Sequence, residues 1–255
     1  MVPMAVVRVA GPDRGVVTLT LDAPANRNAL SAALVAELAA ALEEAGKDDS
    51  VRAAVLTHTG TTFCAGADLR EPPDPGAFVA LLRQVVELPK PVVARVTGHV
   101  RAGGLGLLAA CDIAVAGSAG GTEASFALTE VHIGVVPAVI SLTLLPRLDP
   151  RAASRYYLTG ERFDAAEAAR IGLITAYATG ADDVDGVLAP VLDGLRKAAP
   201  GALADAKKLV TARVLDAFDK EADAYVALSA HRFGSAEARE GMAAFLERRE
   251  RSWAL

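Results

Sequence analysis

The sequence predicts an α/β fold with a helical C-terminal part. In the first half of the chain, strand-like runs alternate with helix-like runs, which favours parallel strands joined by right-handed crossovers. From Asp149 onward Ala, Leu, Arg and Glu dominate, and the chain is predicted to be mostly helical. Of the 255 residues 52% are apolar and 22% are charged. A chain of this composition can bury a proper core and is not disordered.

The first elements follow from short-range periodicity. Val16–Leu21 alternates Val, Thr and Leu, which is typical of a strand. Leucines at positions 30, 34, 38 and 42 repeat every four residues and predict one face of a helix, with Gly46 as its end. Further strands are predicted at residues 51–56, 91–96 and 113–116.

The later elements are mainly helical. Asp164 is a predicted N-cap for a helix over residues 165–170, with Glu167 at the capping-box spacing. Residues 203–253 predict several amphipathic helices. The sequence contains no internal repeat. Within its first half, Glu71-Pro72-Pro73-Asp74-Pro75-Gly76 is a clear cluster of helix and strand breakers. This cluster is either a lid over a site or an ordinary surface loop.

Two glycine-containing corners are the most informative features. In residues 96–112 an apolar strand-like run passes into a helix-like run through Gly103 and Gly104. Glycines let a backbone approach a ligand closely, and the first helical turn offers free N–H groups and the positive end of the helix dipole. Phe63–Leu69 follows another strand-like run and is similarly small. Two such corners can together form an oxyanion hole.

The ordered set of motifs resembles the crotonase superfamily, the enoyl-CoA hydratases and isomerases. The resemblance covers nearly the whole chain and rests on seven segments: Asn26–Leu30, Phe63–Leu69, Gly98–Asp112, Phe126–Glu130, Gly134–Pro137, Thr159–Ala165 and Glu240–Glu247. It implies a crotonase-like ββα spiral core over residues 1–198 that holds a thioester site. It also implies a C-terminal helical oligomerisation region, residues 199–255, in a homotrimer or a dimer of trimers.

The resemblance implies an acyl thioester of coenzyme A as substrate, with no further cofactor. The thioester oxygen is expected to accept hydrogen bonds from the backbone N–H groups of Ala67 and Gly103, and one such donor contributes about 3–4 kcal/mol to the transition state. Arg249 or Arg251 in the last helix is expected near the phosphates. The implied contacts to coenzyme A and the acyl group are Arg27, Ala29, Ala65, Asp68, Leu69, Gly106 and Pro137.

Glu130 is the expected proton-transferring group. Hydratases of the family carry two glutamates, and here Gly106 stands at the first position while Glu130 keeps the second. A single carboxylate can move a proton between two carbons, which is isomerisation, or can activate water. We rank hydration first on whole-chain similarity to hydratases, including a methylglutaconyl-type branch. A glycine inside a helix costs about 1 kcal/mol relative to alanine, so Gly106 predicts space for a bulky acyl group or a water. Close helix packing is the alternative.

Two side chains beside the glycine turn and two other classes of function are alternatives. His99 and Arg101 flank the glycine turn and can transfer a proton or orient a charged acyl group, although a structural role is the simpler interpretation. Gly104-x-Gly106-x-x-Ala109 matches a relaxed dinucleotide-binding pattern, but it lies in mid-chain and overlaps the helix start. A non-catalytic protein that binds acyl-CoA is the other alternative.

Composition excludes several classes of function. The net charge is −5 and no basic block is present, so we expect no nucleic-acid partner. Cys64 and Cys111 form no disulfide framework, which fits a reducing cytoplasm. The apolar stretch 133–145 is interrupted by Pro137 and is too short to span a membrane, and residues 1–10 do not resemble a signal peptide. The four histidines lack metal-ligand spacing, so no metal is expected.

Overall fold

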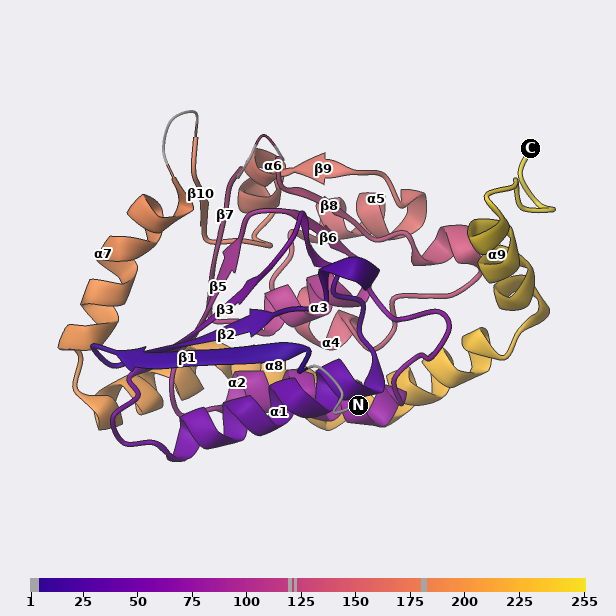
Figure 1. Cartoon of the computed structure of the whole chain (residues 1–255). Coiled ribbons are helices and arrows are strands. Elements are labelled where there is room, and N and C mark those ends of the chain that lie inside the picture. The colour runs from indigo at the N-terminus through magenta and orange to yellow at the C-terminus, as the bar shows by residue number, and fades with distance from the viewer. Residues whose placement is uncertain (1–4, 119–120, 122, 180–182) are drawn as a thin grey trace.

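Two sheets and their covering helices form the described part of the chain. The computed structural model describes residues 5–118, 121, 123–179 and 183–255 (Figure 1). The first sheet has six strands in the order β1 (Val7–Asp13), β2 (Val16–Leu21), β3 (Ala53–His58), β5 (Val92–Val96), β7 (Ile113–Ala116) and β10 (Ala176–Tyr177). β1 and β2 are antiparallel, and the other neighbours are parallel.

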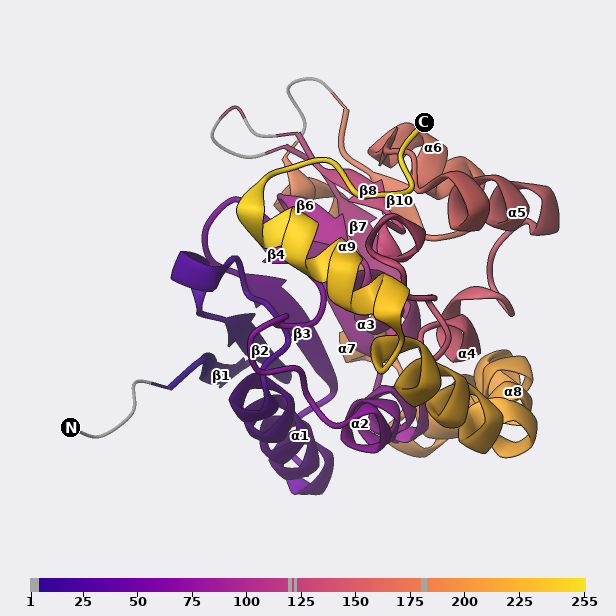
Figure 2. The same cartoon turned by 90° about the vertical axis from the view of Figure 1, so that its right-hand side faces the viewer.

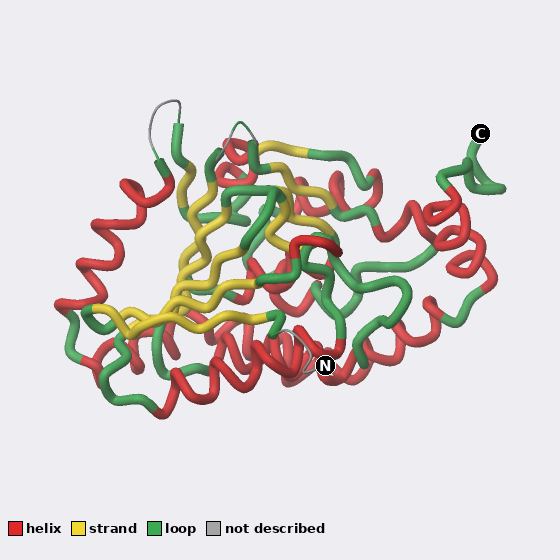
Figure 3. The backbone as a smooth tube through the Cα atoms, in the orientation of Figure 1, coloured by secondary structure: helices red, strands yellow, loops and turns green. Residues whose placement is uncertain are grey.

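The second sheet is smaller and lies beside the first (Figure 3). Its strands are, in order, β4 (Thr62–Cys64), β6 (His99–Arg101), β8 (Ser125–Ala127) and β9 (Phe163–Asp164). β4, β6 and β8 are parallel, whereas β9 runs antiparallel to β8.

The chain enters the two sheets in turn. β3 and β4 are followed by helix α2 (Pro75–Glu87), and β5 and β6 are followed by helix α3 (Gly103–Ala110). β7 and β8 begin a third unit of the same kind. Each unit therefore gives one strand to each sheet before its helix. This arrangement confirms the α/β class and the crotonase-like ββα spiral that the resemblance implied.

Three of the four predicted leucines lie in helix α1 (Ala32–Lys47), whereas Leu30 precedes the helix and forms a β-bridge. Ser31 caps the helix by accepting the N–H of Leu34 at 3.2 Å. Leu34, Leu38 and Leu42 are at most 1% exposed, so this stripe faces the core. The predicted end is slightly wrong, because Gly46 lies within the last turn and the helix continues to Lys47.

The predicted strands are present with small shifts. β2 and β7 have the predicted bounds. β3 lies two residues later than predicted because it remains paired with β2 up to the Leu21–His58 pair. The predicted breaker cluster ends early, since Asp74 accepts the N–H of Ala77 and so starts α2 at Pro75.

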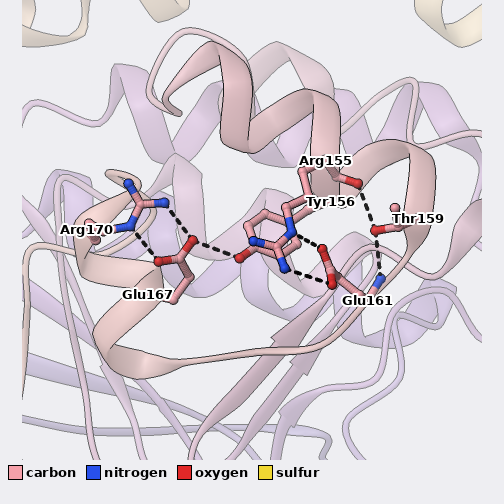
Figure 4. Close-up of polar contacts among 6 residues, drawn as sticks. All are labelled: Arg155, Tyr156, Thr159, Glu161, Glu167 and Arg170. Atoms are coloured by element: carbon pink, nitrogen blue, oxygen red, sulfur yellow. Dashed lines mark hydrogen bonds and ion pairs between the residues drawn. The ribbon is translucent and has the colours of Figure 1, made fainter.

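The predicted helix over residues 165–170 and its predicted N-cap are both present. Helix α5 (Pro150–Thr159) precedes α6 (Ala165–Arg170), and Asp164 accepts the N–H of Glu167 at 2.8 Å, which confirms the N-cap. The reciprocal half of the capping box does not form. The Glu167 carboxylate instead accepts hydrogen bonds from Tyr156 and Arg170 (Figure 4).

The C-terminal part consists of long helices. After α7 (Val184–Lys197), a single helix α8 (Pro200–Phe233) extends over 34 residues, and α9 (Ala236–Glu247) follows. Residues 203–253 therefore hold two helices rather than several. Val214 and Phe218 of α8 belong to the same hydrophobic core as the strands. Figures 1 and 2 show α8 along one side of the molecule and α9 turning back over its end. Within the described ranges, no helix is long and apolar enough to cross a membrane.

Candidate active site

Three of the predicted site residues follow three neighbouring parallel strands. Ala67 comes within three residues of the end of β4, Gly103 within two residues of β6, and Glu130 within three residues of β8. β6 lies between β4 and β8 in the second sheet. Parallel strands have their carboxyl ends at one edge of a sheet, which is where open α/β folds place ligands. The topology therefore brings both backbone donors and the carboxylate to one edge.

The first corner directs the N–H of Ala67 away from its strand partner. Leu30 and Ala67 form an isolated parallel bridge. In this bridge Leu30 donates its N–H to Gly66 O at 2.8 Å, and Asp68 donates its N–H to Leu30 O at 3.0 Å. Because the flanking residues make both bonds, the N–H of Ala67 itself faces the opposite side. That N–H is left available to a ligand.

The second corner is the start of α3. Gly103 is the first helical residue, so its N–H has no acceptor within the helix and lies at the positive end of the dipole. Ala102 before it has φ +48°, a conformation that costs a non-glycine residue about 1–3 kcal/mol. Its N–H donates to Ala127 O at 3.1 Å, which holds the corner against β8.

The two corners touch each other. Gly66 has φ +92°, and a Cβ there would lie 2.7 Å from the Ala102 Cβ and 3.4 Å from the Gly103 nitrogen. A Cβ on Gly103 would lie 2.7 Å from Leu30 Cδ1 and 3.7 Å from the Ala67 nitrogen. Glycine at both positions is what allows this approach. The backbone donors of Ala67 and Gly103 thus stand beside one another, as an oxyanion hole requires.

Glu130 supplies a buried acid–base group. It is the first residue of the 3₁₀ helix η2 (Glu130–Ile133), and it is 8% exposed. No described residue makes a hydrogen bond to its buried Oε2. Burial raises the pKa of Glu130 to about 7, with a smaller opposing effect from its own backbone N–H. A carboxyl group with this pKa can both accept and return a proton near neutral pH.

Helices α5 and α9 enclose the segment that carries Glu130. On one side, His132 of η2 donates its Nε2–H to Thr159 O of α5 at 2.8 Å. On the other side α9 lies directly on the backbone. A Cβ on Gly241 would lie 2.5 Å from the Ile133 carbonyl, and one on Gly134 would lie 2.5 Å from Glu237. This close packing holds the backbone of the segment between the two helices.

The space predicted beside Gly106 is not there. A Cβ on Gly106 would overlap the side chain of Ile140, and Thr143 donates its hydroxyl to Gly106 O at 2.9 Å. Gly106 therefore allows α3 to pack closely on α4 (Ser141–Leu144). At the position where the resemblance implies a first glutamate, this chain has an apolar contact.

The remaining predicted contacts mostly gather around the first corner. Ala65 donates its N–H to Arg27 O at 3.1 Å, which sets the loop of Arg27 and Ala29 beside the segment that leads to Asp68 and Leu69. Pro137 lies on the segment after Glu130. The predicted phosphate contact Arg249 already forms ion pairs with two glutamates, Glu240 and Glu247.

Sequence reasoning missed a buried asparagine in this loop. Asn28 is fully buried, and its Oδ1 accepts the N–H of Ala23 at 2.7 Å. Its Nδ2 donates to Thr62 O at 2.7 Å and to Thr59 O at 3.1 Å. This side chain therefore joins the loop to the start of β4. A polar residue in a predicted loop carries no signal of such burial.

The alternative chemical groups are engaged elsewhere. Arg101 donates to the hydroxyl of Ser125 at 2.8 Å, and that hydroxyl lies 2.9 Å from His99 Nδ1. Burial, aided by the nearby cations, lowers the pKa of His99 and lowers that of Arg101 to about 10. Burial raises the pKa of both Cys64 and Cys111 to about 12, which makes them unreactive thiols. Among the described residues no three His, Cys, Asp or Glu side chains are grouped to hold a metal ion.

Comparisons with known proteins point to one family. Residues 11–254 match the family model described as enoyl-CoA hydratase/isomerase. A solved enoyl-CoA hydratase from Mycobacterium avium is 50% identical, with a TM-score of 0.89, over 98% of this chain and 99% of its own. A Thermus thermophilus protein named provisionally as an enoyl-CoA hydratase is 34% identical over 92% of this chain and 95% of its own. The 1,2-epoxyphenylacetyl-CoA isomerase of Escherichia coli is 34% identical over 64% of this chain and 66% of its own.

Proposed function

The chain belongs to the enoyl-CoA hydratase/isomerase family of the crotonase superfamily, and on that premise we propose that it is an enoyl-CoA hydratase. The observation that supports this proposal is that three site residues lie at one edge of the second sheet. The buried carboxyl of Glu130 lies at the same edge as the adjacent backbone donors of Ala67 and Gly103. The names of two similar proteins, from Mycobacterium avium and Thermus thermophilus, support hydration over other reactions of the family.

The proposed reaction uses one carboxylate twice. The thioester oxygen accepts the N–H groups of Ala67 and Gly103. Glu130 takes a proton from water while the water oxygen forms a bond to Cβ of the enoyl group, and the π electrons move to the thioester oxygen as an enolate. The protonated Glu130 then returns its proton to Cα, so that one water is added in total. A pKa of about 7 suits both halves of this cycle.

Isomerisation is the second candidate, and Ile140 is the observation that favours it. The side chain of Ile140 occupies the position beside Gly106, so no second carboxylate faces the acyl group from there. A single carboxyl that removes a proton from C2 of a 3-enoyl thioester and returns it to C4 needs no second partner. The buried, retained Glu130 disfavours a purely binding role.

Hydration and isomerisation are separable in one assay set. We would follow the loss of conjugated-thioester absorbance with 2-enoyl-CoA substrates, its gain with 3-enoyl-CoA substrates, and thiol release as a measure of hydrolysis. We expect hydration to be fastest and Glu130→Gln to lower it by about 10²–10⁴-fold. Faster isomerisation would establish the second candidate, and thiol release alone would refute both.

We further propose that the protein assembles as a homotrimer or a dimer of trimers. Leu209 and Val210 are 80% and 74% exposed on α8, which is unusual for adjacent apolar side chains on a long helix. Light scattering after size exclusion measures the mass directly. A mass of one chain at micromolar concentration would refute the assembly.

A further inference from the structure

A relay of two hydroxyl groups reaches the segment that carries Glu130. Ser141 at the start of α4 is buried, and its Oγ donates to Pro137 O at 2.7 Å. The same Oγ lies 3.1 Å from the hydroxyl of Tyr157. A serine hydroxyl has one hydrogen, which the Pro137 bond uses. Tyr157 must therefore donate to Ser141, and the direction of the relay is fixed.

Helix α5 attaches to this segment twice. Tyr157 contacts the end of the segment through Ser141. Thr159 O accepts the hydrogen bond of His132, which lies near the beginning of the segment. Gly160 makes the second contact feasible, because a Cβ there would lie 2.8 Å from the His132 ring. One helix thus fixes both ends of residues 132–141, immediately after Glu130.

Tyr157 also lies within electrostatic range of Glu130. Burial raises the pKa of Tyr157 most, the bond to Ser141 lowers it, and the charges of Glu130 and Tyr225 raise it further. The hydroxyl of Tyr157 therefore remains protonated at neutral pH and remains a donor. Ionisable side chains on the elements packed against this segment include His132 in η2, Arg155 in α5, Arg232 in α8 and Glu237 in α9.

We propose that Tyr157 is a positioning residue for Glu130. Its hydroxyl, acting through Ser141 and Pro137, fixes the segment that holds the carboxyl at the edge of the second sheet. This inference rests on the proposed function and adds a residue to it. An active site with a single catalytic carboxylate depends on the placement of that group for both proton transfers. A hydroxyl that fixes the segment carrying Glu130 therefore contributes directly to turnover.

The neighbouring Tyr156 provides a matched control. Its hydroxyl donates to Glu167 at 2.8 Å (Figure 4), and Glu167 is not one of the residues of the candidate site. Tyr156→Phe and Tyr157→Phe each remove one hydroxyl from α5. We expect Tyr157→Phe and Ser141→Ala to lower kcat about ten- to a hundredfold, as loss of catalytic alignment does. We expect KM to change less than about twofold, because the backbone donors are untouched, and Tyr156→Phe to keep wild-type kinetics.

The pH profile separates positioning from general destabilisation. In Tyr157→Phe we expect the acidic limb of kcat/KM, which reports ionisation of the free enzyme, to move relative to wild type and to Tyr156→Phe. A profile and kcat that coincide with wild type would overturn the proposal, and so would equal losses in both tyrosine variants.

A readout without turnover distinguishes this inference from the proposed function. The carboxyl infrared band that is lost in Glu130→Gln reports the titration of Glu130 directly. If wild type processes no enoyl-CoA, the proposed function fails, yet a shifted titration in Tyr157→Phe alone would still support the positioning role. An unshifted titration in a folded Tyr157→Phe protein would overturn it.

Discussion

Burial of Glu130 predicts a specific dependence of stability on pH. The folded protein raises the pKa of this carboxyl from 4.5 to about 7. The unfolded chain therefore binds fewer protons than the folded one between these values, so the folding free energy becomes less favourable as pH rises through this window. The contribution is fully present below pH 4.5 and is lost above about pH 7.

The magnitude follows from the same shift. One pKa unit corresponds to 1.36 kcal/mol, so a shift from 4.5 to about 7 limits the loss to about 3 kcal/mol. Glu130→Gln keeps the shape of the side chain and removes its titration. Between pH 4.5 and 7.5 we expect wild type to lose about 2–3 kcal/mol more than Glu130→Gln does.

Urea denaturation of both proteins at several pH values tests this prediction. Subtracting the two unfolding free energies cancels the other titrating groups, which the variants share. Comparison of the slope of each unfolding curve shows whether the same surface is exposed in both. A difference that stays constant from pH 4.5 to 7.5 would show that the folded protein does not raise the pKa of Glu130. It would then be unsupported that this carboxyl both accepts and donates a proton near neutral pH.

Three other substitutions test particular contacts. Gly241→Ala places a Cβ 2.5 Å from the η2 backbone, so α9 must move by about 1 Å to restore ordinary contact. Because this movement exposes η2, we expect the pKa of Glu130 to fall toward 4.5. An acidic limb of kcat/KM that stays where it is in wild type would contradict this expectation. Lys207→Met removes the ion-pair partner of buried Asp112 at 2.8 Å and leaves only the more distant charge of Arg147 beside it, so urea denaturation curves should give a loss of about 3–5 kcal/mol in unfolding free energy. Gly106→Glu should lower the midpoint of thermal unfolding, because the side chain of Ile140 fills that space. A folded variant with faster hydration would show instead that the position faces the acyl group, as the sequence predicts.

Local patterns in the sequence were sufficient for part of the fold and site. The leucines at positions 34, 38 and 42 determined α1 and its buried face, since a helix places such residues on one side whatever surrounds it. The glycines at Gly66 and Gly103 indicated two backbone corners, because only the absence of a Cβ permits such close approach. The order of the motifs then identified Glu130 as the carboxylate.

Long-range packing decided the rest. The strands β4, β6 and β8 have three residues each, too few for a period, and they exist because neighbouring strands complete their hydrogen bonds. The space beside Gly106 was filled by Ile140, which lies distant in sequence and adjacent only after folding. The raised pKa of Glu130 depends on burial, and burial is a property of the assembled chain. Sequence periodicity reports which face of an element is apolar, whereas the neighbour that covers that face is determined only when distant segments meet.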